Sequence, residues 1–253
     1  IWLMVWTFVG GWLAAAGANA INMYIDRDID KLMERTKNRP LATGAIRPRN
    51  ALVFAITLEI VAFVILLAGA NLLAACLAMS ATAFYVFVYS LWLKRSSKQN
   101  IVIGGAAGAV PVLVGWAAVT NSLGWAPVVL FVIIFLWTPP HFWALAIRHT
   151  EDYRAAGVPM LPVVASMKET IRSMIAYSVV LTVSTLVLVP VANLGLIYGI
   201  TALVFGVAFV IGTIALGSNP TEARSMRLFS FSITYVSAIF LALTLDVLLI
   251  SAS

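Results

Sequence analysis

Charged residues are scarce in this sequence, and their scarcity limits what the chain can be. Only 10% of the 253 residues are Asp, Glu, Lys or Arg, while 62% are hydrophobic. Soluble domains carry about 25% charged and about 45–50% apolar residues. Together with a mean hydropathy of +1.01, this composition excludes an ordinary soluble domain and favours lipid as the surrounding solvent.

Cysteine is almost absent as well. The single cysteine, Cys76, lies in an apolar run, which excludes a disulfide or a cysteine-based metal site within the chain. The net charge of +6 would suggest nucleic acid only if the cations formed one face. They fall instead in four separate segments, so no nucleic-acid partner is expected. No cleavable signal pattern is visible.

Apolar runs long enough to cross a bilayer occur eight times. Backbone groups in lipid must be hydrogen-bonded within the chain, so each run predicts a helix, and the alternation typical of strands is absent. We therefore predict an all-α, polytopic membrane protein with a bundle of about eight transmembrane helices. The expected spans are Ile1–Met23, Ala51–Ala70, Leu72–Leu93, Ile101–Thr120, Trp125–Ile147, Ser173–Val191, Leu196–Leu216 and Leu228–Ile250.

The loops between these runs alternate in charge. All sixteen Lys and Arg residues lie in the first, third, fifth and seventh loops, and the other loops carry no charge. With eight spans these four loops share one side, which the positive-inside rule predicts to be cytoplasmic, or the matrix side in an organelle.

The order of loops also repeats. The long charged loops, Asp26–Asn50 and Arg148–Arg172, stand half a chain apart, and each is followed by a tight neutral turn and a short basic loop. This order predicts two four-helix repeats around a central cavity. The plainer explanation is that any eight-span protein shows alternating loop sizes.

The strongest local signal is an Asn and two Asp spaced by four where the first run ends. On a helix, Asn22, Asp26 and Asp30 would share one face, while Asp28 would point away from it. Oxygen-bearing side chains suit hard divalent cations, and Mg²⁺ is usually held by carboxylates together with substrate phosphates. The pattern predicts a magnesium site, with a solvated acidic helix end as the alternative.

Basic residues follow this acidic group directly. Arginine binds phosphate oxygens through a bidentate fork, so we expect Arg35 and Arg39 to contact a diphosphate. For Arg47 and Arg49 a role in topology alone is the better interpretation.

A second set of candidates ends the third run. Lys94 and Arg95 could reach the same phosphate group from a neighbouring helix, with Tyr89 one turn before them. Asn100 then opens a run rich in small residues around Gly104. Small residues permit close helix packing or leave space beside a bulky ligand.

The fifth run holds both histidines of the chain. Pro139 and Pro140 are expected to break the helix near mid-membrane and to free backbone carbonyls. His141 follows them within the bilayer and is a candidate functional residue, because ionisable side chains are rare there; a hydrogen-bonded core histidine is the alternative. His149 lies nearer the edge, and we assign it to the phosphate end.

Four more carboxylates are notable. Glu151 and Asp152 form a second acidic cluster half a chain after the first. Glu59 lies within a predicted span without an evident chemistry. Asp246 is expected at the opposite interface.

Taken together, these residues resemble the UbiA-type intramembrane prenyltransferases over nearly the whole chain. The Asn-Met-Tyr-Ile-Asp-Arg-Asp-Ile-Asp motif is shared by the superfamily, whereas the Pro-Pro-His-Phe-Trp and Ala-Gly-Val-Pro-Met-Leu-Pro pieces resemble its heme branch. The matching segments are 22–30, 35–40, 89–95, 100–105, 115–116, 137–146 and 151–162.

The resemblance implies transfer of a farnesyl group from farnesyl diphosphate to a vinyl group of heme b, giving heme o. It implies that Mg²⁺ is the cofactor. The partners it implies are enzymes of the heme A pathway or proteins that assemble a terminal oxidase. The location implied is the bacterial plasma membrane, or the mitochondrial inner membrane if eukaryotic. Residues 1–253 would form a single prenyltransferase domain, and since members are expected to have nine spans, the first helix would be missing here.

The resemblance also assigns roles to the candidates. Catalytic residues would be Asn22, Asp26, Asp30 and Asp152, and metal ligands would be Asn22, Asp26, Asp30, Glu151 and Asp152. Substrate contacts would be Tyr89, Lys94, Arg95, Arg35, Arg39, His141, His149 and Tyr153. Many members carry a second Asp-xxx-Asp motif, and His149 and Tyr153 occupy those positions here, so the residue that meets a second metal stays open.

Two other functions compete with this one. Another prenyltransferase of the superfamily would act on a quinone precursor or a chlorophyll-type ring. A secondary transporter would also combine a repeat with intramembrane charges, but it predicts acidic residues near the midplane rather than at one face.

Overall fold

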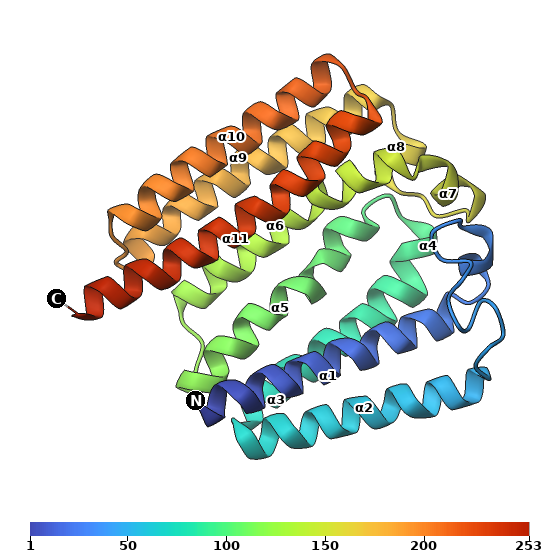
Figure 1. The fold of residues 1–253 in the computed structure, drawn as a ribbon, viewed down its shortest axis with the longest axis horizontal. Helices are drawn as coiled ribbons and strands as arrows, with labels where there is room; N and C mark the ends of the chain where they lie inside the picture. The colour runs from blue at the N-terminus through green and yellow to red at the C-terminus, as the bar shows by residue number, and fades with distance from the viewer. Residues whose placement is uncertain (253) are drawn as a thin grey trace. The chain divides into compact units, whose positions relative to one another are not determined.

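The computed structural model describes residues 1–252, and the long apolar segments within them are helices. Within these residues, eight helical spans are long and apolar enough to cross a membrane, as the sequence predicts (Figure 1). The spans are α1 (Trp2–Ile25), α2 (Pro48–Gly69), α3–η2–α4 (Leu72–Ala83, Phe84–Leu93 and Lys94–Ser96), α5 (Asn100–Thr120), α6 (Trp125–Arg148), α9 (Met167–Val191), α10 (Leu196–Ser218) and α11 (Glu222–Ala252). Shorter elements are η1 (Ile29–Leu32), α7 (Thr150–Ala155) and α8 (Leu161–Val164).

The chain divides into two compact units. The first contains Ile1–Leu123 and Glu151–Met160, and the second contains Gly124–Thr150 and the described residues from Leu161 onward. Each unit holds four of the eight spans, so the predicted division into four-helix halves is confirmed. The internal repeat, the central cavity and the single domain over 1–253 stay predictions; residue 253 lies outside the described residues.

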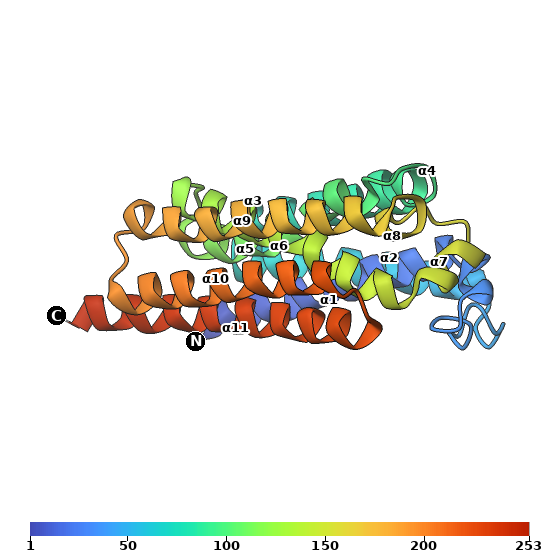
Figure 2. The same cartoon turned by 90° about the horizontal axis from the view of Figure 1, so that it is seen from above.

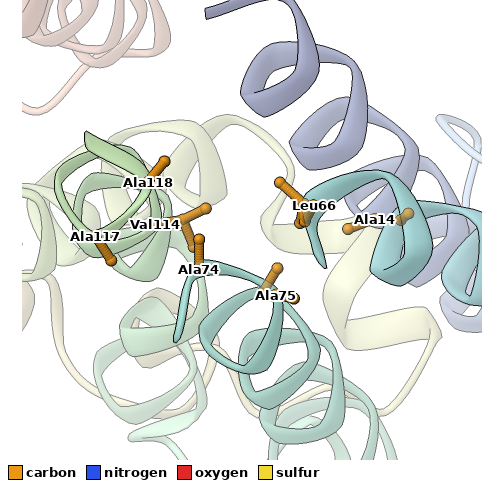
Figure 3. Close-up of a cluster of buried hydrophobic side chains, with 9 residues drawn as sticks. Ala14, Leu66, Ala74, Ala75, Val114, Ala117 and Ala118 are labelled. Carbon is orange, nitrogen blue, oxygen red and sulfur yellow. The ribbon is translucent and has the colours of Figure 1, made fainter. Parts of the chain in front are cut away.

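Small side chains bring the helices of the first unit together. A buried cluster, built mostly of alanines, joins α1, α2, α3 and α5, and Figure 3 shows its side chains gathered between these helices. A side-chain carbon on Gly10 of α1 would lie only 2.6 Å from the Cγ atom of Leu66 in α2. Close backbone approach through small residues is the usual way for helices to associate in lipid.

The second unit is held by buried polar contacts as well as by packing. α9 packs on α6 and α10, and α11 packs on the same two helices (Figures 1 and 2). The Tyr235 hydroxyl lies 2.5 Å from Thr185 Oγ1, and the Tyr198 hydroxyl donates to the Thr185 carbonyl at 3.2 Å. Asp246 accepts from the backbone N–H groups of Gly195 at 2.6 Å and Tyr198 at 3.3 Å. This carboxylate therefore caps the start of α10.

Two helices begin earlier than the apolar runs predict. α9 starts at Met167 because the Ser166 side chain accepts a hydrogen bond from the Glu169 N–H at 3.2 Å. α11 starts at Glu222, with Thr221 Oγ1 accepting from the Arg224 N–H at 3.3 Å. Polar first turns of this kind are helical but lie outside a run of apolar residues.

The expected break in the fifth span is wrong. α6 continues from Trp125 to Arg148 through Pro139 and Pro140. Each proline removes one backbone donor, but packing of α6 against α9 and α11 holds the helix together. The Thr138 hydroxyl donates to the Ile134 carbonyl at 2.8 Å within the same stretch.

Glu59 is buried in the middle of α2. The Thr82 hydroxyl of α3 lies 3.2 and 3.3 Å from its two carboxyl oxygens. A side-chain carbon on Gly17 of α1 would lie 2.6 Å from Glu59 Oε1. Glu59 therefore sits where three helices of the first unit meet, with a hydroxyl as its partner.

Candidate functional site

The acidic motif begins on α1 and continues past its end. The spacing predicts that all three residues share one helix face, but α1 ends at Ile25 and Asp30 lies in the short helix η1. The four-residue register nevertheless persists: the Asp26 N–H donates to the Asn22 carbonyl, and the Asp30 N–H to the Asp26 carbonyl, both at 2.8 Å. All three side chains are buried.

Asn22 ties the motif to the third span. Its Nδ2 donates to Asp26 Oδ2 at 2.7 Å and to Ser90 Oγ at 3.0 Å. Ser90 is fully buried and lies in η2, a ten-residue π-helix. Wide π turns are rare and frequently mark functional sites. Sequence reasoning missed Ser90, because no residue pattern in the run indicates a π-helix.

Asp26 is the most buried member of the group. Its side chain is inaccessible to solvent and forms an ion pair with Lys94, the first residue of α4. Figure 1 shows α4 beside the loop that follows α1. Arg95 Nη2 lies 3.6 Å from the other oxygen, Oδ1. Among the described side chains, no hydrogen bond reaches that oxygen. A buried carboxylate oxygen without a donor is costly, and it suits a cation ligand.

Asp30 is paired with Arg39, an arginine that the sequence predicts to contact a diphosphate. Arg39 Nη1 contacts both carboxyl oxygens, at 2.9 and 3.0 Å. The Thr36 hydroxyl donates to the Asp30 carbonyl at 3.0 Å and fixes the loop between them. The guanidinium is about a third exposed, whereas the carboxylate is buried, so this cation stands between the acidic group and solvent.

Asp28 is more exposed than the three motif residues, with a side chain that is 60% accessible to solvent. Arg95 donates to both of its oxygens at 2.7 Å. This hydrogen bonding outweighs the desolvation by burial and lowers the pKa of Asp28 to about 2. The carboxylate stays charged at physiological pH and orients Arg95 toward Asp26.

Tyr89 occupies space that a glycine leaves free. Its ring lies under Lys94 Nζ, 6.0 Å from the ring centroid, and stacks on Tyr85 at 5.3 Å. A side-chain carbon on Gly104 of α5 would lie 2.4 Å from the Tyr89 ring. Asn100 Nδ2 donates to the Lys94 carbonyl at 3.4 Å. The small-residue run of α5 therefore supports the tyrosine and lysine of the third span.

The second acidic segment joins the first unit, although its neighbours along the chain belong to the second. The Glu34 N–H donates to Asp152 Oδ1 at 3.3 Å. Burial raises the pKa of the Tyr153 hydroxyl, and Arg35 partly opposes this by its charge and hydrogen bond. Arg35 and Arg39 thus have different partners, and the two acidic segments meet in one unit.

Glu151, which the sequence predicts to be a metal ligand, is exposed to solvent. Its side chain is 85% exposed and paired with Arg154. Within the described residues, no group of three His, Cys, Asp or Glu side chains is arranged to hold a metal ion by itself. A metal held here would therefore need the Asn22 amide, Asp26, Asp30 and ligands from a substrate phosphate, which is the usual coordination of Mg²⁺.

Both histidines belong to the second unit. His141 is buried with its ring stacked on Trp137 at 4.1 Å and on Phe229 at 4.4 Å. Its Nδ1 lies 2.6 Å from Ser232 Oγ of α11. His149 follows α6 as its C-cap residue, and its place at the phosphate end stays a prediction.

The chain belongs to the UbiA prenyltransferase family, whose model matches residues 1–244. It is therefore a multi-pass membrane enzyme of the prenyltransferase class. Its relatives include proteins named protoheme IX farnesyltransferase. The one from Gloeobacter violaceus is 53% identical over 96% of this chain and 80% of its own length. The one from Parafrankia sp. is 50% identical over 98% of this chain and 80% of its own length. The one from Streptomyces coelicolor is 50% identical over 96% of this chain and 79% of its own length.

Solved structures confirm the fold. A structure of digeranylgeranylglyceryl phosphate synthase is similar with a TM-score of 0.78 and 20% identity, covering 96% of this chain and 85% of that one. A structure of a UbiA homolog from Archaeoglobus fulgidus bound to DMAPP and Mg²⁺ is similar with a TM-score of 0.68 and 17% identity. That match covers 96% of this chain and 88% of the other.

Proposed function

We propose that this enzyme transfers the farnesyl group of farnesyl diphosphate to a vinyl group of heme b and so makes heme o. The observation that carries the proposal is the buried, donor-free oxygen of Asp26, whose carboxylate lies beside Asn22 and is paired with Lys94 and Arg95. The names of the relatives support heme b as the acceptor.

The reaction breaks the bond between farnesyl C1 and the diphosphate oxygen, and the diphosphate leaves with the electron pair. The terminal vinyl carbon bonds to C1, water adds to the resulting carbocation, and one proton is lost. Asn22, Asp26 and Asp30 would hold Mg²⁺, which supplies Lewis-acid stabilisation of the leaving group.

The cations of the first unit would bind the phosphate oxygens. Arg39 and Lys94 already lie against Asp30 and Asp26, and Arg95 lies 3.6 Å from Asp26. Donors aimed in advance at developing negative charge stabilise a transition state without further reorganisation. Arg35 would join them, and Tyr89 and Tyr153 would contact the substrate.

A second metal would be held by Asp152, with Glu151 beside it. The contact of Asp152 with the Glu34 backbone supports this, because it brings the carboxylate to the loop that carries Arg35. His149 would assist at the diphosphate end.

His141 would contact the porphyrin. Its ring lies among Trp137, Phe142 and Phe229, and flat aromatic surfaces suit a macrocycle. A neutral imidazole is also a ready iron ligand.

A transfer assay tests the function. Purified protein with farnesyl diphosphate, heme b and Mg²⁺ is expected to give a product heavier than heme b by one farnesyl group and one hydroxyl group, measured by mass spectrometry. Chelation with EDTA should stop the reaction. Transfer to a hydroxybenzoate or to a chlorophyll-type ring in preference to heme b would refute the proposed acceptor.

The active site would face the cytoplasm, or the matrix in a mitochondrion, because every lysine and arginine lies in the four charged segments between the apolar runs of the sequence. The membrane would be the bacterial plasma membrane, or the mitochondrial inner membrane. Heme A pathway enzymes or a terminal oxidase would then take up heme o.

Cysteine labelling checks the sidedness. In a Cys76→Ala background, Ser97→Cys and Ser122→Cys should be labelled from opposite sides, because the single span α5 separates them. Impermeant maleimide should reach Ser97→Cys from the cytoplasmic side only. Labelling of both positions from one side would contradict this topology.

A further inference from the structure

A serine of α11 determines which nitrogen of His141 carries a proton. Ser232 Oγ donates to the Phe229 carbonyl at 2.6 Å and lies 2.6 Å from His141 Nδ1. The hydroxyl has one proton and the carbonyl has none, so that proton lies between Ser232 and Phe229. Nδ1 must then carry its own proton and donate it to Ser232 Oγ.

The other ring nitrogen is left with a lone pair. In a neutral imidazole protonated on Nδ1, Nε2 is the acceptor. Within the described part of the chain, no hydrogen bond is made by Nε2 of His141. The nitrogen best suited to bind a metal is therefore the one without a protein partner.

The ring is also held on both faces. Trp137 stacks on it with an interplanar angle of 20° and Phe229 with an angle of 23°. Trp137 Nε1 donates to the Ser232 carbonyl at 2.8 Å, so Ser232 contacts both the imidazole and one of its stacking partners. Ser232 is fully buried.

We infer that Ser232 is a positioning residue for the acceptor: it fixes His141 as the Nδ1–H tautomer so that Nε2 binds the iron of the heme substrate. This inference rests on the proposed function, in which His141 contacts heme. Histidines that bind metals usually donate their other N–H to a protein group, which fixes the ring and strengthens the ligand.

Resonance Raman spectra of ferrous heme bound to the purified protein test the inference. The parent protein should show an iron–histidine stretching band, and His141→Ala should lack it. Ser232→Ala should move the band to lower frequency and weaken heme affinity about tenfold in a Soret titration, since loss of such a partner typically costs about 10–100-fold. Ser232→Thr keeps the hydroxyl and should restore both values.

Ser178→Ala is the matched control, because Ser178 is another fully buried serine of the second unit and contacts Thr213 rather than His141. It should leave the band and the affinity unchanged. If His141→Ala removes the band but Ser232→Ala leaves it at the parent frequency, the positioning role is wrong and the heme contact stands. If His141→Ala matches the parent, His141 is not an iron ligand, and the role of Ser232 falls with it. Farnesyl transfer itself is judged separately by the product assay.

Discussion

Replacing Asp26 with alanine is expected to abolish farnesyl transfer while the protein stays folded. Asp26 is the only member of the motif with a buried oxygen that lacks a donor in the described part of the chain, and its other oxygen faces Lys94. The variant would lose a metal ligand and leave that lysine without its counter-charge. Several kcal/mol of lost transition-state stabilisation corresponds to about a thousandfold in rate, measured as heme o formed per minute.

Two companion variants separate chemistry from folding. Asp26→Asn keeps the size of the side chain and removes the charge, so it should be nearly as inactive as Asp26→Ala while retaining the parent melting temperature more closely. Glu34→Ala removes a carboxylate from the same loop whose side chain is 77% exposed, and it should keep near-parent activity. Near-parent turnover by Asp26→Ala would end the assignment of the metal site.

The spans could be predicted from the sequence because lipid imposes one strong rule, that the backbone must satisfy its own hydrogen bonds. Under that rule each apolar run long enough to cross the bilayer must be a helix, and the eight runs of this sequence predict the eight spans. It does not describe helix ends, which depend on side chains such as Ser166 that cap a polar first turn. It also does not show whether a helix continues through Pro139 and Pro140, because packing against neighbouring helices decides that.

The site could be predicted in part for a related reason. The four-residue spacing of Asn22, Asp26 and Asp30 survived the end of α1, because backbone hydrogen bonds of the same register continue beyond it. The Asn22 contact with Ser90 could not be predicted, because it depends on the π-helix and on a packing between distant helices. The meeting of Arg35 with Tyr153 is equally non-local.

The ion pairs of the site lead us to expect that metal and diphosphate bind cooperatively. Asp30 is paired with Arg39, and Asp26 with Lys94. Metal alone would draw the carboxylates from their cations, and diphosphate alone would draw the cations from buried carboxylates. Each ligand provides the partners that the other displaces, so each should raise the affinity for the other by the same factor, about 5–150-fold for typical coupling.

Arg39→Ala should reveal this exchange by two changes of opposite sign. Without the guanidinium, Asp30 has no ion pair to break, so Mg²⁺ alone should bind more tightly than to the parent, by about tenfold for roughly 1.4 kcal/mol. Magnesium pyrophosphate should bind more weakly by a similar factor, because a phosphate contact is lost. Isothermal titration with Mg²⁺ and with magnesium pyrophosphate measures both, and Arg47→Ala, which changes a cation assigned to topology alone, should match the parent in each. If Arg39→Ala weakens both ligands equally, Arg39 does not pass from Asp30 to the diphosphate, and the arginine instead holds the loop in place.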